Sequence, residues 1–179
     1  MAALCGRRAR CAHPRHRRDR VSILILQGRR CARPPLTSPL QPQLWTELRR
    51  LAQAVGRQLE LRPCADLREL IGSLRAARRR GCEFVLLDPG ELAPQALASP
   101  EPLRRALDEL PSDYIEVHAD SATTLDERLR ARAAPIATIV INGDLAASYR
   151  LALGIALRRL QRARAALPAD DPPSQARPR

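Results

Sequence analysis

Five short runs rich in apolar residues, separated by segments with helical periodicity, limit what this chain can fold into. The runs cover residues 21–26, 59–61, 84–87, 114–118 and 136–141. Runs of this length are typical of parallel strands that are buried on both faces, and a parallel pair needs a crossover, usually a helix, between its strands. The sequence therefore predicts strands and helices in alternation.

The segments between the runs carry apolar residues at helical spacing. We expect helices over residues 44–55, 67–80, 103–110 and 125–132, and a long final helix from residue 145. The segments 29–42 and 91–102 are expected to be irregular. Crossovers of this kind are right-handed, so the sequence predicts an α/β fold, a flavodoxin-like doubly wound five-stranded parallel sheet in three layers, α/β/α.

Composition fits one domain with a core of Leu, Ile, Val and Ala, because 45% of the 179 residues are apolar and 2% are aromatic. The net charge is +12, and every basic residue is Arg. Residues 1–20 hold seven Arg and one Asp without a periodic apolar pattern. We therefore expect a disordered basic arm over residues 1–20, a domain over residues 21–165 and a disordered tail over residues 166–179.

The basic arm has several interpretations. It could be a solvated extension, an organelle-targeting peptide, the product of an upstream start codon or an arm that binds nucleic acid. The sequence favours an extension over a nucleic-acid arm, because it offers charge without aromatic residues for base stacking. A zinc site from Cys5, Cys11, His13 and His16 is disfavoured, since the spacing matches no standard finger. We expect no metal.

The five cysteines and the hydropathy indicate a compartment. An odd number of irregularly spaced cysteines without a secretion signal favours free thiols in a reducing cytoplasm. No stretch is long and apolar enough to predict a membrane span, so no membrane partner is expected.

Doubly wound sheets bind ligands at the carboxyl edge of their strands. The loops that begin after Gln27, Asp88, His118 and Asn142 should meet at that edge. The first of these loops has no glycine pattern that would cradle a phosphate, which argues against a nucleotide or flavin cofactor.

Several motifs occur in an order and spacing typical of one family. They are Ile23–Gly28, Asp88-Pro89-Gly90, Ile115-Glu116-Val117-His118, Pro135–Thr138 and Ala147–Leu153. With these motifs, residues 21–160 resemble the type II 3-dehydroquinate dehydratases. The Ile-Glu-Val-His sequence at the end of the fourth strand is the most specific element of the resemblance.

The resemblance implies a lyase of the shikimate or quinate pathway that removes water from 3-dehydroquinate without a metal or organic cofactor. It also implies a homo-oligomer built from trimers and gathered into a dodecamer. By the same resemblance, the residues that bind a small carboxylate substrate are His118, Glu116, Ser121, Arg128, Arg30 and Arg33.

The chain departs from the family pattern where the chemistry lies. The resemblance implies a tyrosine base in the loop after the first strand, but the first tyrosine of this chain is Tyr114. It also implies a site histidine in the loop after the third strand, and that loop contains none. Asp88 stands where the family has Asn, and its carboxylate would repel an anionic substrate unless it is protonated or paired with an Arg.

These departures leave two main hypotheses. The first is a family member with impaired or lost catalysis that binds a small carboxylate or serves as a partner subunit. The second is an active 3-dehydroquinate dehydratase in which Asp88 or Glu91 is the base and His118 is the acid. Glu116 and His118 could also brace the strand end by hydrogen bonds.

Overall fold

The five predicted strands form one parallel sheet. The computed structural model describes residues 22–30, 40–121, 124–125, 129 and 131–166. The strands are β1 (Ile23–Gly28), β2 (Leu59–Cys64), β3 (Phe84–Asp88), β4 (Asp113–His118) and β5 (Ala137–Val140). Their order is β2-β1-β3-β4-β5 and all neighbouring pairs are parallel. This confirms the predicted doubly wound fold.

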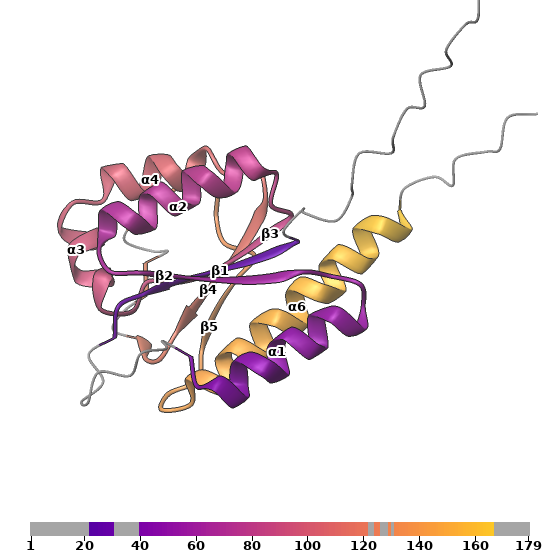
Figure 1. The fold of residues 1–179 in the computed structure, drawn as a ribbon. Coiled ribbons are helices and arrows are strands. Elements are labelled where there is room, and N and C mark those ends of the chain that lie inside the picture. Colours follow the sequence, from indigo (N-terminus) through magenta and orange to yellow (C-terminus); the bar gives the residue numbers. More distant parts are fainter. Residues whose placement is uncertain (1–21, 31–39, 122–123, 126–128, 130, 167–179) are drawn as a thin grey trace, which may run out of the picture.

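Helices cover both faces of the sheet, as predicted (Figure 1). The helical segments are α1 (Pro42–Ala54), α2 (Leu67–Arg80), η2 (Gly90–Leu92), α3 (Ala93–Ala98), α4 (Glu101–Asp108) and α6 (Leu145–Ala165). In Figure 1, α2, α3 and α4 lie on one face, and α1 and α6 lie on the other. The sheet is thus the middle layer of three.

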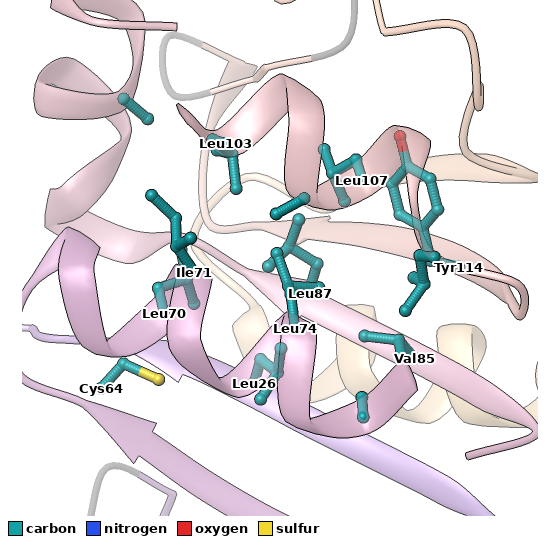
Figure 2. Packing of buried hydrophobic residues seen from close by; sticks show 14 of the residues in the cluster. Leu26, Cys64, Leu70, Ile71, Leu74, Val85, Leu87, Leu103, Leu107 and Tyr114 are labelled. Carbon is teal, nitrogen blue, oxygen red and sulfur yellow. The ribbon is translucent and has the colours of Figure 1, made fainter. Parts of the chain in front are cut away.

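Alternate residues of each strand enter two separate cores. Leu24 and Leu26 of β1 belong to the core beneath α2 and α4, whereas Ile23 and Ile25 belong to the core beneath α1 and α6. Figure 2 shows the first core, in which Leu70 and other α2 residues meet residues of the strands and α4. Because side chains alternate along a strand, sequence parity tells which layer a strand residue faces.

Several segments differ from the sequence prediction; β2 continues to Cys64, for example, and α4 already begins at Glu101. Helix α1 begins at Pro42 rather than at residue 44, because proline is well suited to the first turn, where its missing N–H is not needed. Residues 91–98, within the stretch 91–102 expected to be irregular, lie in η2 and α3, and Pro94 again lies in the first turn. Ala93 and Ala96 bury this short helix against the α2/α4 core, which supplies a stabilisation that the local sequence does not reveal.

Some sequence predictions fall on residues outside the described part. These are the arm over residues 1–20, the tail after Ala166, the proposed zinc ligands and most of the helix expected over residues 125–132. Among the helices of the described residues, none is long and apolar enough to cross a membrane. Cys64 and Cys82 are free and buried, and burial raises the pKa of both thiols, which keeps them protonated and weakly reactive.

The ends of β1 and β3 approach each other closely. A Cβ atom on Gly28 would lie 2.0 Å from the carbonyl oxygen of Pro89, a distance that no side chain can accept. Gly90, at a φ of +54°, turns the chain back so that the next residue, Glu91, donates its N–H to the carbonyl of Arg29 at 3.1 Å. These glycines bring the first residues of two loops side by side at the carboxyl edge.

We predict that Gly28→Ala lowers the free energy of unfolding by about 1–3 kcal/mol, because the added methyl group must push two backbone segments apart. Gly72→Ala is the matched control. Gly72 is an exposed residue inside α2 whose Cβ would meet nothing within 4 Å, so alanine there should stabilise the helix by about 0.5–1 kcal/mol. Urea denaturation of the wild type, Gly28→Ala and Gly72→Ala measures both effects. Equal effects of the same sign would contradict the close approach of Gly28 to the Pro89 carbonyl.

Candidate functional site

The carboxylate of Asp88 is the centre of a buried polar cluster at the carboxyl end of β3. Asp88 is fully buried, and its two oxygens accept four hydrogen bonds. Oδ1 accepts from Arg30 Nη2 at 2.6 Å and from the backbone N–H of Gly90 at 3.1 Å. Oδ2 accepts from the Tyr149 hydroxyl at 2.6 Å and from Gln27 Nε2 at 3.2 Å. The cluster therefore joins β1, β3, α6 and the turn after β3.

Arg30 compensates the charge of Asp88. The carboxylate is completely buried, whereas the Arg30 side chain retains 26% exposure. A buried carboxylate needs a paired cation and hydrogen bonds, and this pair supplies both. From the sequence, the Asp88 carboxylate is expected to repel an anionic substrate unless it is protonated or paired with an arginine, and in the structure it is paired with Arg30.

Tyr149 is held in its neutral form. It is fully buried, and desolvation raises its pKa well above the ordinary value of 10.0, with the adjacent negative charge of Asp88 and the hydrogen bond to it acting in the same direction. The phenol therefore remains a hydrogen-bond donor to Asp88. A tyrosine in this state is not a base.

Glu116 and His118 form a second buried group, at the end of β4. His118 Nε2 lies 3.0 Å from Glu116 Oε2, and both side chains are 1% exposed. The same oxygen accepts the backbone N–H of Leu125 at 3.3 Å, so Glu116 anchors the segment that follows the strand. Which of the two groups donates in the Glu116–His118 contact depends on the tautomer of the histidine. These contacts hold the end of β4 and the segment that follows it in place.

The two groups lie on opposite sides of the sheet. Gln27 and Asp88 are register partners in β1 and β3 and continue the parity of the residues that face α1 and α6. Glu116 and His118 continue the parity of Tyr114, whose side chain enters the core beneath α2 and α4. The candidate base and candidate acid of the active-enzyme hypothesis therefore project from different faces of one edge.

A buried serine joins the strand ends to α6. Ser148 Oγ accepts the N–H of Ile141 at 3.1 Å and lies 3.4 Å from the carbonyl oxygen of His118. This contact fixes the start of α6 beside the ends of β4 and β5. It also places Tyr149, the next residue of the helix, over the Asp88 side of the sheet.

The remaining candidates are less constrained. Ser121 and Glu91 are exposed, and Ser121 accepts through its carbonyl from the Thr124 hydroxyl at 3.0 Å. Arg33 and Arg128 lie outside the described residues. Across the described part of the chain, no three His, Cys, Asp or Glu side chains gather in a way that could hold a metal ion.

Sequence reasoning did not identify Gln27 and Tyr149 as partners of Asp88. Two signals could have identified them. Gln27 is a polar residue that continues a buried strand with the parity of Ile23 and Ile25, and Tyr149 lies on the apolar face of its helix. A buried hydroxyl or amide needs a hydrogen-bond partner, and Asp88 has the matching parity.

Comparison with known proteins identifies the family. The sequence profile of Dehydroquinase class II matches residues 39–157. Over 122 residues the chain is 34% identical to 3-dehydroquinate dehydratase 1 of Pseudomonas aeruginosa, an alignment that covers 67% of this chain and 80% of that protein. The chain belongs to the type II dehydroquinase family. This confirms the resemblance that the motifs indicated.

Other relatives of this type II dehydroquinase family member extend the match. The 3-dehydroquinate dehydratase of Polynucleobacter asymbioticus is 30% identical over 154 residues, which cover 80% of this chain and 98% of that protein. The type II dehydroquinase from Propionibacterium acnes superposes with a TM-score of 0.55 at 22% identity, over 76% of this chain and 97% of that one. At that identity the superposition supports the fold alone.

We predict that Tyr149→Phe lowers the free energy of unfolding of this dehydroquinase-family domain by about 1.5–3 kcal/mol, the usual range for a hydrogen bond to a charged group. Tyr114→Phe is the matched control, because its hydroxyl donates to the neutral carbonyl of Ala133 at 2.8 Å. Its loss should cost about 0.5–1.5 kcal/mol. Urea denaturation at neutral pH compares the two variants, and a smaller loss for Tyr149→Phe would contradict the role assigned to this contact.

The raised pKa of Tyr149 also predicts a pH dependence. Below pH 10 the phenol is protonated in both the folded and the unfolded chain, so its contribution to stability is complete. Above pH 10 the unfolded chain loses this proton first, and the contribution decreases as pH rises toward the folded pKa. The stability difference between the wild type and Tyr149→Phe should therefore shrink between pH 10 and pH 11 in urea titrations. A constant difference over that interval would show that the phenol is not perturbed.

Proposed function

We propose that this chain is a divergent type II dehydroquinase whose dehydration of 3-dehydroquinate is impaired or lost, and which persists as a small-ligand-binding or partner subunit. The observation that carries the proposal is the position of its tyrosines. The sequence contains two, Tyr114 and Tyr149, and both are buried in the domain core, 3% and 0% exposed. Neither can reach a substrate from the first loop as the family's base does.

The other acid–base candidates support the same proposal. Each oxygen of Asp88 already accepts two hydrogen bonds, so it could take a substrate proton only after breaking one of them. His118 is 1% exposed and holds its Nε2 against Glu116. A general base must lie within hydrogen-bond reach of the proton that it removes, and these contacts keep both residues engaged elsewhere.

Ligand binding in this proposal relies on residues that the resemblance supplies. Arg128, Arg33 and Ser121 are proposed to bind a small carboxylate, while Glu116 and His118 hold the segment after β4 in place. We further propose a cytoplasmic homo-oligomer based on trimers, in keeping with the family and with the free, buried Cys64 and Cys82.

The alternative is an active 3-dehydroquinate dehydratase in which His118 is the acid and Glu91 or Asp88 is the base. Exposed Glu91, at the first turn after β3, is the feature that favours it. Loss of the base alone would lower the rate by about 10²–10⁴-fold, which leaves room for weak activity through a substitute carboxylate.

We predict that the purified protein, offered 3-dehydroquinate, produces no rise in the ultraviolet absorbance of the conjugated enone product on the time scale of a working relative. The 3-dehydroquinate dehydratase 1 of P. aeruginosa serves as the positive control. Turnover within about tenfold of that control would overturn the proposal. If turnover is observed, its loss in both His118→Ala and Glu91→Gln, with the folded state retained, would establish the alternative.

A further inference from the structure

The ion pair between Asp88 and Arg30 has a consequence for the charge of a ligand at this edge. An arginine two residues after the first strand, at the carboxyl edge of a doubly wound sheet, is well placed to bind a small carboxylate through its planar fork of N–H groups. In this chain Arg30 Nη2 already donates to a carboxylate of the protein itself, at 2.6 Å.

Asp88 is fixed in that position by its other contacts. The Gly90 N–H, the Tyr149 hydroxyl and Gln27 Nε2 hold the carboxylate at 3.1, 2.6 and 3.2 Å. A carboxylate arriving from solution would have to displace one that is already oriented and loses no translational freedom on binding. Displacement would also leave the charge of Asp88 buried without its cation.

Two polar atoms of the Asp88 cluster that have no hydrogen-bond partner in the described part of the chain favour a neutral group over a carboxylate. Gln27 Oε1 is a buried acceptor, and Arg30 Nε is a buried donor, and neither has a partner among the described residues. A hydroxyl group both donates and accepts, so it complements the two atoms without adding charge.

We propose that Asp88 is a specificity-determining residue, which withdraws Arg30 from anion binding and makes this part of the site accept neutral hydroxylated ligands in preference to carboxylates. The inference rests on the proposed function for the location of the ligand, at the carboxyl edge of the sheet. Any carboxylate of that ligand is then bound away from Arg30.

The test compares two probes with the same carbon skeleton, meso-tartrate and erythritol, by isothermal titration calorimetry near 0.15 M ionic strength, where long-range attraction to the basic surface is screened. The affinities of the wild type for the two probes, including any tartrate bound through Arg33 or Arg128, are the reference. In Asp88→Asn, which keeps an oxygen acceptor but releases Arg30, tartrate affinity should rise about tenfold or more, while erythritol affinity stays within about twofold.

Two further variants separate the causes of such a gain. Tyr149→Phe removes a contact from the same carboxylate but leaves its charge on Arg30, so it should show no gain. The double variant Asp88→Asn/Arg30→Gln should lose the gain, because it lacks the guanidinium that Asp88→Asn releases. A gain caused by tartrate bound to other arginines would persist in the double variant. A gain in Tyr149→Phe, a gain that survives in the double variant, or no gain in Asp88→Asn would each overturn the inference.

A measurement on the wild type keeps the inference testable if Asp88→Asn does not fold. The Arg30 Nε–H signal, assigned in nitrogen-15 NMR spectra by its loss in Arg30→Gln, should stay in place during a tartrate titration. A saturable shift of that signal would overturn the inference. Neither experiment involves turnover, so dehydration by the wild type would overturn the proposed function and leave the charge preference intact.

Discussion

A single buried negative charge constrains much of this structure. The Asp88 carboxylate is fully removed from solvent, and a carboxylate in that position is strongly destabilising unless it is paired and hydrogen-bonded. Arg30, Gln27, Tyr149 and the Gly90 N–H together meet that requirement. The donors come from β1 and the residues after it, from the turn after β3 and from α6, so the charge on β3 can be buried only when all of these segments are in place.

The close approach of β1 and β3 serves the same arrangement. Gly28 allows the Pro89 carbonyl to approach where a side chain would otherwise stand, and Gly90 turns the chain so that its own N–H meets Asp88. The Asp88 cluster is therefore built into the junction of the sheet with its loops. On the other face of the edge, Glu116 plays a comparable part by holding His118 and the Leu125 backbone. In both groups the titratable side chains make contacts that hold the scaffold together, which supports the proposal of impaired catalysis beside the burial of both tyrosines.

The sequence predicted the fold well because its signals are local. Continuous apolar runs mark buried parallel strands, and Asp66 and Gly81 mark the two ends of α2, where the structure finds a side-chain cap and a left-handed residue. Helix α3 was missed because its six residues are stabilised by the burial of Ala93 and Ala96 rather than by their own periodicity. For the site, the sequence selected Asp88, Glu116 and His118, but it did not show that strand parity separates Asp88 from the other two.

The sequence by itself determined the class of fold, the family motifs and the absence of a tyrosine from the first loop. Those properties depend on residue identity and on spacing along the chain. Only the tertiary structure decided what the substituted carboxylate does. Gln27 and Tyr149 are each 61 positions from Asp88 along the chain, and Arg30 is 58 positions from it. A buried charge is stabilised by whichever donors the fold brings within about 3 Å, and such distances between remote residues are set by how the layers pack.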